Sequence, residues 1–311
     1  MIDTINLTLF KESVPNIDLM AEISPYLTSI TGEGLSYGVP TIYGKLNNLD
    51  VVIRDDKVNV KNGSLCKYYL GNNLSEMGIA DTQKSIESLS DLLHLPIEKS
   101  IVSKLHFGMN LMLSNEPILY YKYLGNCVNF ERLVQPHGIN YKLADRELAL
   151  YDKIKELKHH REPIHPLYKD RFVLRIEGRL NKNIAKHFNM SRIEAKFLYN
   201  EDFYLMLISN LQTNYEQINK LKIPKLDMNE ITTRSKMQKL GVLALIEQEG
   251  GLLRALENLE ERYKQKKLTK KQNHDLKNLY LECSKMKLQT MDSDLIIELD
   301  RKVNEKFKYW Q

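Results

Sequence analysis

The chain has 311 residues, 42% of them hydrophobic, and a formal net charge of +5. This composition excludes a largely disordered protein, because enough apolar side chains are present to form a core. No apolar run approaches the eighteen or so residues of a membrane helix, and three widely spaced cysteines exclude a disulfide framework. The opening "MIDTINLTLF" lacks the basic and then apolar pattern of a signal peptide, so we expect a cytoplasmic protein without a membrane partner.

The first 180 residues are predicted to form short strands joined by turns, with one helix. The segment "INLTLF" alternates and places Ile5, Leu7 and Leu9 on one face of a strand. "LDVVIRDDKVNV" is typical of a hairpin that turns at residues 54–57. "SIESLSDLLHL" predicts a helix, because its apolar residues recur at helical spacing. These residues are Ile86, Leu89, Leu92 and Leu93.

Further strands are predicted in the second half of this region. They are "IVSKLHFGMNLML", the hairpin "GINYKLADRELALYDK" with its turn at Ala144–Arg146, and "RFVLRIEGRL" after a loop that contains prolines. From Asn181 onward, apolar residues fall at helical spacing and charges crowd the gaps between them. We therefore expect an α+β fold, with a central antiparallel sheet in residues 1–180 and an α-helical domain in residues 181–311.

One segment of the helical region has the outline of a helix–turn–helix motif. In "NIAKHFNMSRIEAKFLY", Asn189 can take the left-handed turn conformation, and Ser191 with Glu194 has the spacing of a capping box. The second helix would present Arg192 and Lys196 to DNA phosphates. Ordinary helical hairpins show the same pattern, so it does not by itself establish major-groove binding.

Positive charge is concentrated in the C-terminal two-thirds of the chain. Residues 1–100 contain 8 Lys or Arg and 13 Asp or Glu, whereas "ERYKQKKLTKK" (Glu261–Lys271) alone holds six basic residues. They are Arg262, Lys264, Lys266, Lys267, Lys270 and Lys271. Thr269 and Gln272 have capping-box spacing, which predicts that a helix begins within this segment. We expect the segment to bind phosphates without base specificity, the simpler alternative being a solvated face.

Three predicted strands each carry an apolar face and a polar face, because side chains alternate along a strand. Their polar positions include His106 and Gly108, Tyr151 and Lys153, and Arg175, Glu177 and Arg179. If these strands are neighbours with their polar faces aligned, His106, Tyr151, Lys153 and Glu177 meet on one surface. Arg175 and Arg179 beside them are candidate DNA contacts. The simpler interpretation is that these faces contact water.

The same residue types suit a metal-dependent attack on a phosphodiester. Histidine and carboxylates bind divalent cations, and carboxylate oxygen favours Mg²⁺ or Mn²⁺. Tyr151 would be the nucleophile, activated by the metal and by Lys153, because the ordinary pKa of tyrosine is about 10. Tyr141 is the alternative nucleophile, and we rank it lower because it shares an apolar face with Ile139 and Leu143. The histidines His159, His160 and His165 are better explained by a polar loop than by a metal site.

At these residues the sequence resembles the replication initiators of the filamentous-phage gene II/gene X type, which include relatives on bacterial plasmids and phages. The similar segments are "MIDTINLTL", "VSKLHFGMNL", "LALYDKIKEL" and "FVLRIEGRL", in the order and spacing of that family. "LALYDKIKEL" is similar to its Tyr-x-Lys-x-x-Glu segment, which implies roles for Tyr151, Lys153 and Glu156. Glu177 matches the acid of the later strand. His106 stands where the family usually has aspartate.

The resemblance implies a protein that nicks one strand of origin DNA and stays attached to the 5′ phosphate through its tyrosine. The freed 3′-hydroxyl would start rolling-circle replication in a bacterial host cell, with a host helicase or polymerase as a further partner. Residues 1–180 would be the nicking domain and residues 181–311 the DNA-binding domain.

The resemblance also implies that His106, Glu156 and Glu177 hold the Mg²⁺ or Mn²⁺ ion. On a continuing strand Glu156 would face away from Tyr151, so this role requires a helix start near Lys153. Histidine at position 106 is neutral and softer than aspartate. It therefore also fits the alternative function, a non-catalytic replication regulator that binds specific DNA.

Overall fold

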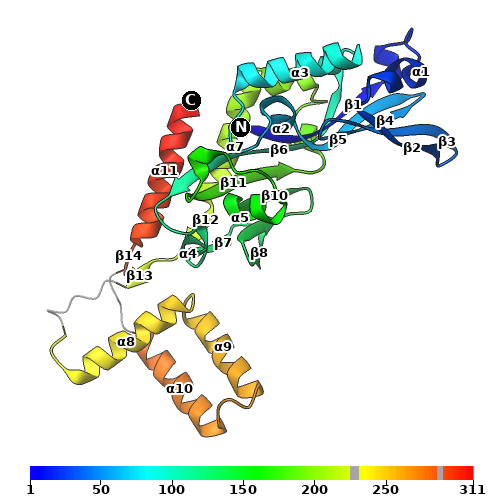
Figure 1. Ribbon diagram of the computed structural model, residues 1–311. Helices are drawn as coiled ribbons and strands as arrows, with labels where there is room; N and C mark the ends of the chain where they lie inside the picture. Colours follow the sequence, from blue (N-terminus) through cyan, green and yellow to red (C-terminus); the bar gives the residue numbers. More distant parts are fainter. Residues whose placement is uncertain (225–230, 286–289, 311) are drawn as a thin grey trace. The chain divides into compact units, whose positions relative to one another are not determined.

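The computed structural model describes residues 1–224, 231–285 and 290–310. Its main element within these residues is an antiparallel sheet of ten strands in the order β2-β3-β4-β5-β1-β6-β11-β10-β9-β8 (Figure 1). The strands are β1 (Ile2–Phe10), β2 (Ser29–Ser36), β3 (Val39–Leu46), β4 (Leu49–Arg54), β5 (Lys57–Ser64), β6 (Ile101–Leu113), β8 (Glu131–Gln135), β9 (Gly138–Lys142), β10 (Arg146–Asp152) and β11 (Phe172–Leu180). The combination of this sheet with separate helices confirms the predicted α+β class.

The predicted strands are present, because the alternation of apolar residues and the residues at the turns indicate the same strand limits. Ile5, Leu7 and Leu9 of β1 are buried on one face, and the hairpin β4–β5 turns at Asp55–Asp56. The strand β6 and the hairpin β9–β10 also lie where the pattern placed them. In β11, however, residues of both faces are buried, and Phe172 is exposed at the start of the strand.

Helices lie between and after these strands. They include α1 (Leu19–Ile23), α2 (Leu65–Leu70), α3 (Ile79–Leu93), α5 (Lys153–His159), α6 (Ile184–His187) and α7 (Glu201–Glu216). The helix α3 begins where the Asp81 carboxylate accepts from the Gly78 backbone N–H and ends at His94 in the left-handed conformation. Its buried stripe contains Ile86, Leu89 and Leu93. Leu92 was predicted on this stripe together with Leu93, but Leu92 is exposed, because adjacent helix residues lie about 100° apart and Leu93 is the one buried.

The described chain divides into two compact units, and the boundary differs from the one expected near residue 180. The first unit contains Met1–Ile118, Cys127–Gln217 and the chain from Val303, and the second contains Leu119–Asn126 and Ile218–Lys302. The helix α7 belongs to the first unit and buries Phe203, Leu207 and Leu211. The rise in helical character at Asn181 therefore marks a change in local structure within one unit.

The predicted helix–turn–helix motif is wrong. Only α6 and a 3-10 helix at Ala195–Tyr199 form in this segment, and Glu194 at the start of the second has no capping hydrogen bond. The reason is a competing backbone interaction: Ile193 accepts from the Val102 N–H, and Ala195 donates to the Ser100 carbonyl. These bonds extend the segment beside the start of β6, so a recognition helix cannot begin there. Asn189 does take the predicted left-handed conformation.

The second unit is largely helical in its described residues. Its elements include α8 (Arg234–Gln248), α9 (Leu252–Lys264) and α10 (Lys270–Cys283), together with short strands β12 (Ile218–Lys220), β13 (Ile223–Pro224) and β14 (Thr290–Met291). Elements α4 (Pro117–Tyr121), β7 (Leu124–Cys127) and α11 (Asp294–Trp310) contain residues of both units. The predicted capping box of Thr269 and Gln272 is confirmed at the start of α10. Throughout the described residues, helices are too short or too polar to cross a membrane.

Candidate active site

Three neighbouring strands bring the predicted polar residues together. In the sheet β6 pairs with β11, and β11 pairs with β10, so their polar positions form rows across the strands. The rows are His106–Arg179–Glu147, Gly108–Glu177–Ala149 and Asn110–Arg175–Tyr151. This face does not simply contact water, because Arg175 and Glu177 are each only 3% exposed. Buried charges of this kind require partners.

Two glycines allow the close approach of these strands. A Cβ atom at Gly108 would lie 2.2 Å from the Ile176 carbonyl oxygen and 2.9 Å from the Glu177 Cα. A Cβ atom at Gly138 would lie 2.6 Å from the Leu150 carbonyl oxygen and 2.9 Å from the Tyr151 Cβ. Glycine is therefore required beside both members of the central carboxylate–phenol pair described below.

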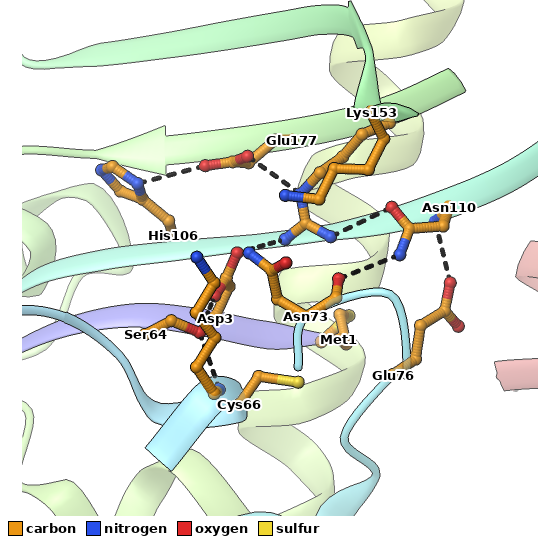
Figure 2. A network of polar contacts seen from close by, with 12 residues as sticks. Met1, Asp3, Ser64, Cys66, Asn73, Glu76, His106, Asn110, Lys153 and Glu177 are labelled. Atoms are coloured by element: carbon orange, nitrogen blue, oxygen red, sulfur yellow. Dashed lines mark hydrogen bonds and ion pairs between the residues drawn. The ribbon is translucent and has the colours of Figure 1, made fainter. Parts of the chain in front are cut away.

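The Glu177 carboxylate is the centre of the site. Its Oε2 accepts a hydrogen bond of 2.7 Å from the Tyr151 hydroxyl and one of 3.0 Å from the Arg175 Nε. Its Oε1 lies 3.1 Å from the Arg179 Nε and 3.1 Å from the His106 Nδ1, and Figure 2 shows the His106 and Glu177 side chains pointing toward each other. Burial alone would raise the pKa of Glu177, but Arg175, His106 and Arg179 hold that pKa well below its usual value.

Tyr151 is a neutral phenol in this environment. Burial, and then the neighbouring Glu177 carboxylate, raise the pKa of Tyr151 well above its ordinary value of 10.0. Two cations lie over its ring, with the Lys153 Nζ at 5.8 Å and the Arg179 Cζ at 5.7 Å from the ring centroid. The hydroxyl proton therefore remains on oxygen and is donated to the adjacent carboxylate.

The Arg175 side chain is buried in the protein interior and not exposed, as a DNA contact would be. Its guanidinium donates to Asp3 at 2.8 Å, to Asn110 at 3.2 Å and to Glu177 at 3.0 Å. Figure 2 shows this interior network, which also includes a hydrogen bond from Ser64 to Asp3. The prediction that Arg175 contacts DNA is corrected, because every nitrogen of its side chain is used within the protein interior.

Asp3 is a member of the site that the sequence pattern did not reveal. Strict alternation would put Asp3 on the apolar face of β1 with Ile5 and Leu7. The pairing of β1 with β6 shifts between Ile2 and Ile5, however, and this irregularity turns Asp3 to the polar face. An acid within an otherwise apolar alternation was the available signal.

Lys153 and Glu156 pair with each other. The helix α5 begins at Lys153, so Lys153 is the first helix residue and not a position on the polar face of the strand, as the alternation predicted. Its Nζ lies 2.8 Å from the Glu156 Oε2. The Lys153 side chain is fully buried, and burial first and Arg175 second lower its pKa. The expected ligand set of His106, Glu156 and Glu177 is not assembled, and in the part of the chain that the structure describes no group of three or more His, Cys, Asp or Glu could hold a metal ion.

A cleft of about 300 Å³ opens beside this network. Tyr151, Glu156 and Arg179 line it, together with Lys155. Three histidines also line it, namely His137, His159 and His160. The sequence pattern assigns His159 and His160 to a loop and gives no role to His137. The position of His137 depends on the register of β9 and β10, because it comes directly before Gly138, which pairs with Tyr151.

The remaining predicted residues lie outside this network. Tyr141, the alternative nucleophile, is fully buried in the apolar core, and burial raises its pKa to about 12, so its expected second-rank role is corrected to a structural one. Arg192 and Lys196 are exposed and both form ion pairs with Glu194. The six basic residues of Glu261–Lys271 lie at the end of α9, in the turn that follows and in the first turn of α10, and they are mostly exposed.

Fold and site together define an α+β protein with a phenol–carboxylate–arginine cluster at the edge of a cleft on an antiparallel sheet. Residues 1–216 match the family described as the N-terminal part of the phage gene II replication-associated protein. The chain therefore belongs to this family of phage replication initiators, as its resemblance to the filamentous-phage gene II type implied. The match ends with α7, close to the Gln217 limit of the first unit. A comparison with curated proteins finds no match. Membership in the family implies that the protein takes part in DNA replication and binds origin DNA.

The close contact at Gly138 leads to a test of the geometry. We expect Gly138→Ala to lower the free energy of unfolding by about 1 to 3 kcal/mol, because its Cβ would lie 2.6 Å from the Leu150 carbonyl oxygen and 2.9 Å from the Tyr151 Cβ. Urea titration monitored by circular dichroism would measure the change. Gly34→Ala is the control, since nothing lies within 4 Å of its Cβ position. Equal stability of the two variants would contradict the close approach of Gly138 to Tyr151.

Proposed function

We propose that the protein is a site-specific DNA nickase and strand transferase that starts rolling-circle replication through a covalent phosphotyrosine. The observation that carries the proposal is the 2.7 Å hydrogen bond from the Tyr151 hydroxyl to Glu177 at the edge of the cleft. A nucleophile that donates its proton to a positioned carboxylate is the arrangement that nucleophilic catalysis requires.

In the proposed reaction the Tyr151 oxygen bonds to phosphorus while the bond from phosphorus to the 3′ oxygen breaks. Glu177 takes the phenol proton, and the departing 3′ oxygen takes up a proton from solvent, to which Glu177 later returns its own. The enzyme is left on the 5′ phosphate, the polarity that the resemblance to the gene II type implies, and the 3′-hydroxyl is free to prime synthesis. The reverse reaction rejoins the strand, because the phosphodiester energy is kept in the tyrosine link.

Arg179 supplies a physical reason for activation by the substrate. It lines the cleft and is partly exposed, whereas Arg175 is buried, so a phosphate that enters the cleft can attract Arg179 away from Glu177. Loss of that contact raises the pKa of Glu177, and the carboxylate becomes a better base for the phenol. The guanidinium meanwhile stabilises charge on the scissile phosphate. Lys155, on the same cleft, would add to this stabilisation.

Whether the proposed reaction requires a divalent ion can be tested directly. His106 and Glu177 offer a nitrogen and a carboxylate side by side, but the carboxylate oxygens already accept from Tyr151, Arg175, Arg179 and His106. Mg²⁺ or Mn²⁺ bound here would polarise the scissile phosphate. Nicking assayed with EDTA, Mg²⁺ or Mn²⁺ shows whether the reaction requires the ion.

We further propose that the basic turn between α9 and α10 binds the DNA backbone. Lys270 and Lys271 occupy the first turn of α10, where positive charge is unfavourable beside the positive end of the helix dipole. Such a placement costs stability, and binding to phosphate would offset it. Host helicase or polymerase would act on the nicked product.

The backbone role of this turn has a measurable salt signature. Replacing Lys264, Lys266, Lys267 and Lys270 by glutamine is expected to make the plot of log K against log salt less steep by about 3 to 4. Fluorescence anisotropy with duplex origin DNA at several salt concentrations measures the slope. Lys84→Gln, an exposed lysine of α3, should change it by less than about one. An unchanged slope in the fourfold variant would show that this turn does not neutralise phosphates.

The alternative function is a non-catalytic regulator that binds origin DNA. Two observations favour it. Both oxygens of the Glu177 carboxylate already accept hydrogen bonds from protein side chains, and the described residues His106, Glu156 and Glu177 do not form a metal-binding group. Supercoiled plasmid that carries the origin separates the two functions. A nickase relaxes it and leaves a denaturant-resistant adduct whose modified peptide contains Tyr151, whereas a regulator binds it without either product in Mg²⁺ or Mn²⁺.

A further inference from the structure

A second cavity, of about 470 Å³, lies in the first unit and shares no lining residue with the Tyr151 cleft. Four aromatic side chains line it, those of Tyr168, Tyr204, Tyr309 and Trp310, and Tyr309 is 81% exposed. We infer that this pocket binds an unpaired nucleobase of single-stranded DNA next to the nicking site. The inference rests on the proposed function only in taking DNA as the substrate.

The aromatic lining is what an unpaired base requires. Bases of single strands stack on aromatic rings, and this contact contributes substantially to affinity for each base. Tyr309 and Trp310 lie at the end of α11, and the Lys306 Nζ lies 5.6 Å from the ring centroid of each. This cation therefore contacts both rings. Tyr168 comes from the segment before β11, and its hydroxyl donates to the Leu74 carbonyl.

Charge in the pocket favours a base edge over a phosphate. Its charged groups are the carboxylates of Glu76 and Asp81 and the ammonium of Lys306, and Lys306 already pairs with Glu76 at 2.6 Å. A phosphate would meet two carboxylates and only one cation, which is already paired. A carboxylate accepts hydrogen bonds from an exocyclic amino group such as the N4 of cytosine, which thymine lacks. The pocket therefore selects cytosine over thymine.

The position of the pocket relative to Tyr151 follows from the strand register. Asn110 lines the pocket and occupies the same cross-strand row as Arg175 and Tyr151. Two strand spacings separate Asn110 from Tyr151, a distance of about 10 Å. Stacked nucleotides rise about 3.4 Å each, so the bound base lies about three nucleotides from the phosphate that Tyr151 attacks.

Asn110 also joins the pocket to the active site. Its backbone N–H donates to Glu76 at 2.8 Å, and its side-chain oxygen accepts from Arg175 at 3.2 Å (Figure 2). A base that contacts Glu76 is therefore connected through Asn110 to the Arg175 guanidinium, which donates to Glu177. Occupation of the pocket and alignment of the nucleophile are linked through this series of hydrogen bonds.

Trp310 is the only tryptophan of the chain, so its fluorescence reports directly on this pocket. We expect a short oligo-dC to quench it saturably, oligo-dT to bind at least about threefold more weakly, and a duplex to leave it unchanged. Tyr309→Ala should weaken oligo-dC binding about tenfold, since one stacking surface is lost. The control Tyr37→Ala removes a fully exposed tyrosine on the β2–β3 turn and should leave binding unchanged.

These measurements separate the pocket from the nicking reaction. Full-length Tyr151→Phe protein should show the same quenching, so a protein that fails to nick but still binds oligo-dC supports the pocket alone. No saturable quenching, or equal losses in Tyr309→Ala and Tyr37→Ala, would overturn the assignment even if nicking is observed. Equal affinity for oligo-dC and oligo-dT would overturn the role of the carboxylates.

Discussion

Replacing Tyr151 with phenylalanine is expected to abolish the covalent adduct and to slow nicking of origin DNA at least about a thousandfold. The ring of phenylalanine keeps its place beside the Lys153 and Arg179 cations, so only the attacking oxygen and its hydrogen bond to Glu177 are removed. The measurement is the fraction of supercoiled plasmid relaxed with time, followed by detection of protein-linked DNA under denaturing conditions.

Tyr141→Phe is the matched control for this experiment. Tyr141 lies in the neighbouring strand β9, but its side chain is fully buried on the apolar face. We expect this variant to nick at nearly the wild-type rate, and both variants to bind origin DNA with unchanged affinity. An adduct that persists in Tyr151→Phe, or that disappears in Tyr141→Phe, would move the nucleophile away from Tyr151.

Arg175→Met is expected to lower the free energy of unfolding of the protein by about 3 to 5 kcal/mol. The substitution leaves two buried carboxylates, Asp3 and Glu177, without the cation that both of them contact at 3.0 Å or less. Urea titration monitored by circular dichroism measures the change. Arg175→Lys should recover only part of it, because an ammonium group cannot reproduce the planar contacts of the guanidinium.

The pair Lys45–Asp50 provides the comparison. Its distance of 2.7 Å is as short as that of the Arg175–Asp3 pair, but it lies on the surface. We expect Lys45→Met to change the free energy of unfolding by no more than about 1 kcal/mol, because solvent screens an exposed ion pair. Similar small losses in both variants would mean that the interior network contributes little to stability.

The same network predicts a dependence of stability on pH. The pKa of Glu177 in the folded protein lies well below its usual value of 4.5, so folding favours the ionised carboxylate. Its contribution is fully present above about pH 4.5 and is lost as the pH falls toward the folded pKa. In Arg175→Met the main cause of the lowered pKa is removed, and acid unfolding should begin at a higher pH than in the wild type.

The prediction from sequence succeeded where one local pattern was enough. Alternation placed β6 and its polar positions correctly, and the turn residues placed the hairpin β9–β10, so Tyr151, Glu177 and His106 were each assigned to a polar strand position, and their meeting depended on the strand order. The same reasoning failed at residues 189–196. There the helical pattern was a good one, but backbone hydrogen bonds to Ser100 and Val102 outcompeted it, and such partners lie about ninety residues away in the chain.

Periodicity, capping residues and turn residues were sufficient to establish the order of strands and helices, the α+β class and the family segments, because each depends on neighbours within a few positions. The contacts between charged side chains, in contrast, depend on the tertiary structure. The irregular pairing at Ile2–Ile5 brings Asp3 to Arg175, and the neighbouring strands bring Arg175 and Arg179 to Glu177. Backbone hydrogen bonds are nearly the same for any pair of strands, so strand order and register, which local sequence does not specify, determine whether Tyr151 faces a carboxylate or solvent.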